Sequence, residues 1–327
     1  MIFIDNQIPY LAAVLSVSHD VFLFDGRTLL REQLLQFKAS AIFVRSITPI
    51  NAELLNGTDI RFVGSATAGI DHVDVDYLKA HNISFASASG SNANAVAEYV
   101  MDWIDELHVV RSATIGIVGF GHIGKLVARY ARAYGMQVLV NDPPLQSQHF
   151  LFPHWCSVVP LTEIMERSDV ITLHVPLTVK GASPTQNMIT TELLNLCSSG
   201  TLFINAARGG LIDERHLSDL VSTGTLRAVL DVFANEPNID PYVVERIAHI
   251  TPHIAGYSLQ AKENAVSMVY EAYTGKPWVR PAIADIPATP TQLQLNHLNF
   301  EEVRRLTPLR DERRTPPTWE ELDVIDS

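Results

Sequence analysis

Three polar residues late in the chain have side chains suited to proton transfer and anion binding. Arg208 lies in INAARGG, Glu236 in LDVFANEP and His253 in TPHIAGY, each shortly after an apolar, strand-like run. Ligands of parallel α/β sheets bind beyond the carboxyl ends of strands, so we expect these residues to share one crevice. A histidine accepts a hydroxyl proton near neutral pH, and a carboxylate on its other ring nitrogen fixes the tautomer. An arginine binds a carboxylate through two parallel hydrogen bonds. The set suits oxidation of a small 2-hydroxy acid at C2.

A glycine-rich turn supplies the second signal. Gly119, Gly121 and Gly124 follow the predicted strand Thr114–Val118 and precede a predicted helix over 123–134. In this context the glycines permit a tight turn, close approach of a pyrophosphate and tight packing of helix on strand. Asp142 ends the next strand about 20 residues on, where an acid accepts hydrogen bonds from ribose hydroxyls and repels a 2′-phosphate. We therefore predict NAD rather than NADP; the alternative is a purely structural turn and a surface aspartate.

The elements that must position these groups alternate between strands and helices. Short β-branched or aromatic runs predict strands at the following ranges: 2–4, 21–24, 41–44, 62–65, 84–86, 114–118, 137–140, 170–173, 201–205, 228–232 and 247–250. Helical segments separate them, for example at 29–37, 74–80 and 92–109. This order predicts an α/β fold with two doubly wound parallel-sheet domains. We expect a Rossmann-type NAD domain and a flavodoxin-like substrate domain.

The predicted domains are interleaved along the chain. Residues 1–92 and 254–280 form the substrate (lid) domain, and residues 93–253 form the NAD-binding domain. After about Lys276, repeated prolines interrupt any long element, so we expect 281–327 to be a tail that is partly disordered by itself, with at most one short helix over 300–314.

Composition excludes several classes of protein. The 327 residues are 47% hydrophobic and carry a formal net charge of −12, which argues against general binding to nucleic acid or to an anionic membrane. A local cluster of arginines still permits a small anionic substrate. Cys156 and Cys197 have no metal-ligand spacing and form no disulfide framework, so we expect no metal site and a reducing compartment. No signal peptide or membrane span is evident, and we expect a cytoplasmic protein.

From about residue 40 to residue 275 the sequence resembles the D-2-hydroxyacid dehydrogenase family. The matching stretches are VRSITPIN, GSATAGIDHVD, GSNANAVAEYV, GIVGFGHIG, NDPP, INAARGGLID, LDVFANEP and HIAGYSLQAKE. The resemblance implies active-site roles for Arg208 and Glu236, and a proton-donor role for His253 in the reduction direction. It implies substrate contacts for Ser46, Thr67 and Tyr257. It places the following residues at the NAD site: His122, Ile123, Asp142, Val175, Ala206, Ala207, Arg208, Asp231 and Gly256. The side chain of Asp231 is expected at the nicotinamide carboxamide.

The resemblance also implies a phosphorylated 2-hydroxy acid as substrate. It assigns no residue to the phosphate, for which Arg45 and Lys262 are our own candidates. It implies a homodimer that forms through a C-terminal dimerisation region. Residues 281–327 resemble only the start of that region. Two departures stand out: the link from Glu98 to Thr114 is short, and Val175 replaces a commonly polar residue. The alternatives are a phosphoglycerate or glyoxylate/hydroxypyruvate enzyme, and a catalytically weakened NAD(H)-binding regulatory protein. As alternatives to substrate contact, Ser46 and Thr67 could serve in turns or helix caps, and Tyr257 could serve in ordinary packing.

Overall fold

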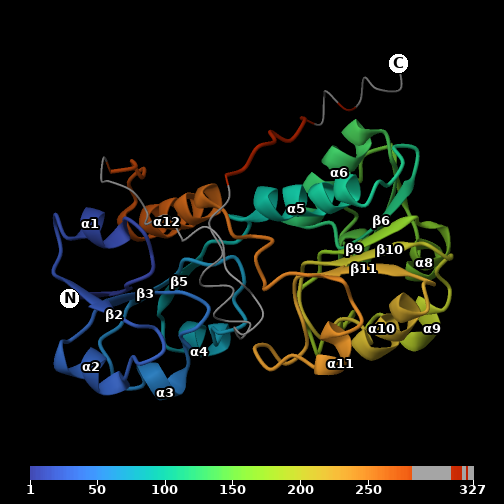
Figure 1. The fold of residues 1–327 in the computed structure, drawn as a ribbon. Helices are drawn as coiled ribbons and strands as arrows, with labels where there is room; N and C mark the ends of the chain where they lie inside the picture. The colour runs from blue at the N-terminus through green and yellow to red at the C-terminus, as the bar shows by residue number, and fades with distance from the viewer. Residues whose placement is uncertain (282–310, 319–321, 323–327) are drawn as a thin grey trace. The chain divides into compact units, whose positions relative to one another are not determined.

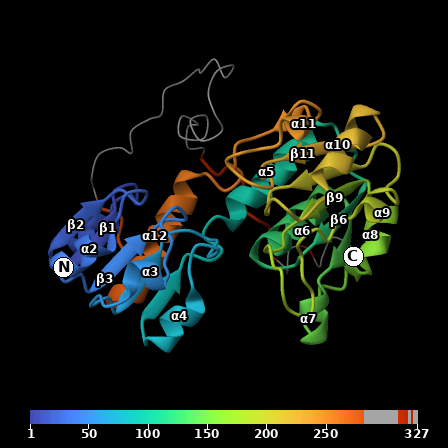
Figure 2. The ribbon, with the colours of Figure 1, turned by 90° about the horizontal axis from the view of Figure 1, so that it is seen from below.

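The computed structural model describes residues 1–281, 311–318 and 322, which divide into two compact units (Figures 1 and 2). Of the described residues, the first unit contains 1–92, 257–281 and 311, and the second contains 93–256, 312–318 and 322. Within the described residues, no helix is long and apolar enough to cross a membrane.

The first unit is a five-stranded parallel sheet with strand order β2-β1-β3-β4-β5. Its strands are β1 (Ile2–Asp5), β2 (Val21–Phe24), β3 (Ala41–Val44), β4 (Phe62–Ser65) and β5 (Ser84–Ser87). Its helices are α1 (Leu11–Leu15), α2 (Arg31–Gln36), α3 (Ala52–Leu55), α4 (Val75–Ala80) and α12 (Leu259–Thr274). This is the flavodoxin-like order, and it confirms the predicted fold of this part of the chain.

Alternation of side chains along each strand separates two cores in this unit. Ile2 and Ile4 pack with residues of α1 and α12, whereas Phe3 between them packs with residues of α2, α3 and α4. Figure 1 shows these two helical layers on opposite faces of the sheet. Both faces are apolar, which explains why the strands appear in the sequence as continuous hydrophobic runs.

The second unit is a seven-stranded parallel sheet with order β12-β11-β10-β9-β6-β7-β8. Its strands are β6 (Thr114–Val118), β7 (Gln137–Asn141), β8 (Cys156–Val158), β9 (Val170–Leu173), β10 (Leu202–Asn205), β11 (Arg227–Leu230) and β12 (His249–Ile250). Its helices are α5 (Ala93–Glu106), α6 (His122–Tyr134), α7 (Pro143–Ser147), α8 (Leu161–Arg167), α9 (Thr191–Leu194), α10 (Glu214–Ser222) and α11 (Pro241–Val244). The order reverses between β6 and β9, as in the predicted Rossmann fold, and so confirms it.

Two cores again lie on opposite faces of the sheet. Alternate strand residues such as Ile115 and Ile117 pack with α5 and α6, and Ile171 and Leu173 pack with α8, α9 and α10 (Figures 1 and 2). Sequence analysis did not predict β8, because a run of three residues is too short for an apolar–polar alternation to indicate a strand.

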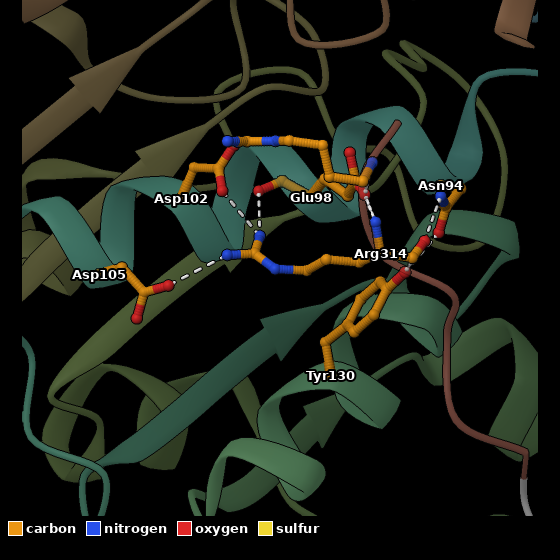
Figure 3. A network of polar contacts seen from close by, with 7 residues as sticks. Asn94, Glu98, Asp102, Asp105, Tyr130 and Arg314 are labelled. Atoms are coloured by element: carbon orange, nitrogen blue, oxygen red, sulfur yellow. Dashed lines mark hydrogen bonds and ion pairs between the residues drawn. The ribbon is translucent and has the colours of Figure 1, made fainter. Parts of the chain in front are cut away.

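Residues 312–318 belong to no helix or strand and lie along α5 and α6 of the second unit (Figure 3). The carboxylate of Glu98 is only 1% exposed and accepts the backbone N–H groups of Arg313, at 2.7 Å, and of Arg314. The Arg314 guanidinium forms ion pairs with Asp102 at 2.8 Å and Asp105 at 3.0 Å. The carboxyl end of α5 is therefore neutralised, where acidic side chains oppose the helix dipole.

The backbone of the same segment is also held by side chains. Asn94 and the Tyr130 hydroxyl donate to the carbonyl of Arg314, at 3.2 and 3.0 Å, and Arg129 donates to the carbonyls of Pro316, at 3.1 Å, and Pro317. Burial beside Glu98 raises the pKa of Tyr130 to about 12, so the phenol remains protonated as a donor. Of the helix expected over 300–314, residues 311–314 are not helical, and the remainder lies outside the described residues.

Candidate active site

His253 and Glu236 form a direct pair in the second unit. Nδ1 of His253 lies 2.8 Å from Oε2 of Glu236, and their side chains are 34% and 22% exposed. The other carboxylate oxygen of Glu236 accepts the backbone N–H of Phe233 at 2.8 Å, which fixes its orientation. Because Nδ1 is engaged by the carboxylate, Nε2 is the ring nitrogen left for proton exchange with a substrate.

Asp231 holds the chain on both sides of His253. It is 1% exposed, and its backbone carbonyl accepts the N–H of His253 at 2.9 Å. Its carboxylate accepts from the Thr251 hydroxyl at 2.6 Å and from the N–H groups of Ile254 and Ala255 at 2.7 and 2.9 Å. Burial raises the pKa of Asp231, against the opposing effects of His253 and these donors. The bonds observed for this carboxylate are thus to the protein itself, and its contact with a nicotinamide stays a prediction.

Arg208 follows β10 in a turn that a buried amide organises. Asn205, which is 0% exposed, donates through Nδ2 to the carbonyl of Arg208 at 2.9 Å and accepts the N–H of Ala207 at 3.1 Å. The guanidinium of Arg208 donates to the carbonyl of Ala207 at 2.7 Å. Sequence analysis missed Asn205 because a single asparagine at a strand end is indistinguishable from an ordinary turn residue.

A second residue missed by sequence analysis, Glu214, joins the turn after β10 to the loop of Glu236. Its carboxylate accepts the N–H of Ala234 at 2.8 Å and that of Gly210 at 3.5 Å. Burial raises its pKa. Gly209 packs so closely here that a Cβ atom would lie 1.9 Å from the carbonyl oxygen of Phe233. The two loops therefore carry Arg208 and Glu236 as one packed assembly, while the sequence shows Glu214 only as an acid in the first turn of a helix.

The glycine-rich turn after β6 has the geometry expected of a dinucleotide site. Gly119 has φ +94°, and a Cβ there would lie 2.5 Å from the carbonyl oxygen of His174. A Cβ on Gly124 would lie 2.0 Å from the carbonyl oxygen of Gly119, whereas one on Gly121 would meet no protein atom within 4 Å. The fold itself thus requires two of the glycines. The space at Gly121 is free for a pyrophosphate, as the spacing of the motif predicts.

The surroundings of the turn fit the same cofactor. Gly121 caps α6 without a side-chain hydrogen bond, and backbone N–H groups at a helix N-terminus can bind an anion such as a phosphate. Asp142 follows β7 and accepts the N–H of Phe120 at 2.7 Å and that of Leu145 at 2.9 Å, which places its carboxylate beside the turn. Each oxygen retains a lone pair with which a ribose hydroxyl can be bound. These residues fit a bound NAD.

The remaining predicted cofactor residues also lie at carboxyl ends of strands in this sheet. His122 and Ile123 begin α6, and Val175 lies close enough to Gly119 that its methyl group would contact a Cβ there at 2.8 Å. Ala206 and Ala207 are buried directly after β10. Gly256 ends the second unit, six residues after β12. Among the residues the structure describes, no cluster of histidine, cysteine and carboxylate side chains suits a metal ion.

The predicted substrate residues lie in the first unit. Ser46 is exposed shortly after β3, and Thr67 is half-buried shortly after the adjacent strand β4, so both follow the carboxyl edge of one sheet. Tyr257 accepts a hydrogen bond from Lys262 at 3.3 Å, and the ammonium lies 4.5 Å from the centre of its ring. Nε of Arg45 donates to the buried carboxylate of Asp5 at 3.0 Å, so the arginine is already anchored on one side.

Comparison with known proteins gives a consistent family. Residues 96–255 match the model of the NAD binding domain of D-isomer specific 2-hydroxyacid dehydrogenases. Erythronate-4-phosphate dehydrogenase of Marinomonas sp. is 42% identical over 275 residues, 82% of this chain and 70% of that protein. The enzyme of the same name from Salinibacter ruber is 41% identical over 263 residues, 76% of this chain and 67% of that one. Among solved structures, D-lactate dehydrogenase from Aquifex aeolicus, complexed with NAD and lactic acid, has a TM-score of 0.67 and 25% identity, covering 84% of this chain and 96% of its own.

Proposed function

The chain belongs to the D-2-hydroxyacid dehydrogenase family and is an NAD-dependent oxidoreductase; we propose that its substrate is 4-phospho-D-erythronate, which it oxidises at C2 to the 2-oxo acid. The substrate assignment rests on relatives that carry the name erythronate-4-phosphate dehydrogenase. It assigns the chain to pyridoxal 5′-phosphate biosynthesis.

The observation that carries the mechanism is the hydrogen bond between His253 and Glu236. NAD+, when bound, would supply the acceptor for the hydride that leaves C2. Nε2 of His253 takes the proton of the C2 hydroxyl as the C–O bond gains double-bond character. Glu236 stabilises the imidazolium that forms and keeps Nδ1 protonated. Arg208 binds the substrate carboxylate through its guanidinium and so fixes which face of C2 meets the nicotinamide.

We assign the substrate-binding role to the first unit, with Ser46, Thr67 and Tyr257 as contacts. Arg45 and Lys262 are cations from the same unit that suit the 4-phosphate. The backbone turn at Gly119–Gly124 would hold the pyrophosphate of NAD, and the carboxylate of Asp142 would bind its adenosine ribose.

Absorbance of NADH at its characteristic wavelength tests the proposal on the purified protein. The panel consists of 4-phosphoerythronate, 3-phosphoglycerate, glycerate, lactate and, in reverse, glyoxylate and hydroxypyruvate. We expect turnover selective for 4-phosphoerythronate. Turnover confined to another acid keeps the mechanism and rejects the substrate. NADH binding without turnover on any acid rejects the catalytic assignment and favours a regulatory protein.

A further inference from the structure

The side chains of Ser65, Thr67 and His72 form a continuous chain of hydrogen bonds in the first unit. Ser65 is the last residue of β4, and the other two follow it. Nε2 of His72 lies 3.1 Å from the Ser65 hydroxyl, which lies 2.9 Å from the Thr67 hydroxyl. The Thr67 hydroxyl donates to the carbonyl of Gly69 at 3.2 Å. Neither Ser65 nor His72 has a role in the mechanism above, although both lie within the GSATAGIDHVD stretch.

The direction of every bond in this chain follows from proton count. A carbonyl only accepts, so the single proton of Thr67 points to Gly69, and Thr67 must accept the proton of Ser65. Ser65 has then used its own proton and must accept from His72. The chain of donors therefore starts at an Nε2–H group on His72. We accordingly assign the ring of His72 the tautomer with its proton on Nε2.

Burial supports a neutral, fixed imidazole at the head of this chain. Ser65 is 0% exposed at the end of β4, so water does not compete for its hydroxyl. Burial lowers the pKa of His72 to about 4, with the neighbouring charge of Asp71 acting in the opposite direction. At neutral pH, His72 thus carries one ring N–H, and its hydrogen bond to Ser65 places it on Nε2.

We propose that His72 and Ser65 are positioning residues that turn the Thr67 hydroxyl into a hydrogen-bond acceptor for the C3 hydroxyl of the substrate. The proposal rests on the function proposed above, in which Thr67 contacts substrate. Thr67 retains one unused lone pair after it accepts from Ser65, and a lone pair complements an O–H group rather than a phosphate or carboxylate oxygen. The C2 hydroxyl gives up its proton in the proposed reaction, so the C3 hydroxyl is the O–H group of the substrate that remains as a donor. The site accordingly selects 2,3-dihydroxy acids over 3-deoxy acids.

The test compares kcat/KM for 4-phosphoerythronate and for 2-hydroxy-4-phosphobutanoate, which lacks only the C3 hydroxyl. We expect wild-type protein to prefer the first by about 10- to 100-fold, as for one lost hydrogen bond to a built site. His72→Phe should reduce this preference at least fivefold, through a higher KM for the dihydroxy acid. The kcat/KM for the deoxy acid and the affinity for NADH should stay within about twofold of wild type, because only one hydrogen bond changes. His72→Gln, which retains an N–H donor, should restore part of the preference.

A matched control is His81→Phe, since the ring of His81 hydrogen-bonds to the carbonyl of Tyr77, stacks on the Tyr77 ring and takes no part in the chain from His72 to Thr67. Equal losses on both substrates in His72→Phe, or no wild-type preference, would overturn the proposal. If the protein turns over unphosphorylated acids instead, glycerate and lactate form the same hydroxy and deoxy pair, so failure of the phosphoerythronate assignment is distinguishable. The ring ¹⁵N shifts of His72 give a readout without catalysis: a proton on Nδ1 at pH 7 contradicts the proposal.

Discussion

Nδ1 of His253 lies 2.8 Å from the carboxylate of Glu236, and this single contact gives the imidazole its orientation and its tautomer. His253→Ala should lower kcat by about 10²- to 10⁴-fold, because the proton acceptor is lost. Glu236→Gln keeps a hydrogen-bonding group but loses the charge that favours imidazolium, and should lower kcat by at least about tenfold. Steady-state kinetics with NADH affinity as control checks both. Wild-type turnover in His253→Ala would reject the assignment.

Arg208 should show its role through a change of substrate affinity. Arg208→Lys keeps the charge but loses the planar pair of donors, so we expect KM for the hydroxy acid to rise by about 10- to 100-fold and kcat to fall. The Asn205 bonds to the same turn involve backbone groups, so the turn is preserved in this variant. Unchanged KM and kcat in a folded protein would show that another residue binds the carboxylate.

Two glycines of the glycine-rich turn between β6 and α6 should behave differently when replaced by alanine. A Cβ at position 121 meets no protein atom, so Gly121→Ala should keep the melting temperature within about 2 °C while weakening NADH binding at least tenfold. A Cβ at position 124 would collide with the carbonyl of Gly119, so Gly124→Ala should destabilise the unit by about 1–3 kcal/mol. Thermal unfolding and NADH fluorescence titration distinguish the two effects. Equal NADH affinity in Gly121→Ala and wild type would contradict the assigned pyrophosphate position.

The attachment of segment 312–318 to α5 should depend more on the side chain of Arg314 than on that of Arg313. Arg314 is 32% exposed and pairs with two carboxylates, whereas Arg313 is 73% exposed and its side chain pairs with one. We expect Arg314→Ala to cost about 1 kcal/mol of unfolding free energy and Arg313→Ala to cost less than about 0.5 kcal/mol. Hydrogen exchange should accelerate at 313–314 in the first variant only. Identical exchange in both variants would show that the backbone bonds to Glu98 suffice.

Acid should destabilise the protein through two buried histidines. Burial lowers the pKa of His72 to about 4 and that of His174 to about 3, from 6.5. The unfolded chain binds these protons near pH 6.5 and the folded chain does not, so the stabilisation is complete above pH 6.5 and declines as pH falls toward 4. Each histidine should account for about 2 kcal/mol lost between pH 7.5 and 5. Urea unfolding at the two pH values checks this: His72→Gln should flatten the dependence, and an equally steep dependence in that variant would contradict the assignment.

Local patterns in the sequence are sufficient for the parts of this protein that depend on local physics. Buried parallel strands must be apolar on both faces, so ranges such as Ala41–Val44 and Phe62–Ser65 were predicted with the bounds that the structure shows. The glycine spacing between β6 and α6 is similarly local, because turn geometry and helix packing restrict the residue type at each position.

Only the tertiary structure decided which side chains support the site. Asn205 and Glu214 appear in the sequence as a turn residue and a helix-start acid, yet they hold the loops of Arg208 and Glu236 through bonds across as many as 20 residues. The same holds for the directions of the hydrogen bonds from His72 to Thr67 and for the position of 312–318 on α5 and α6. Both depend on contacts that leave no periodic pattern in the sequence. Such contacts form once the sheets have brought distant loops together, because a lone polar residue has no local signature until its partner is adjacent in space.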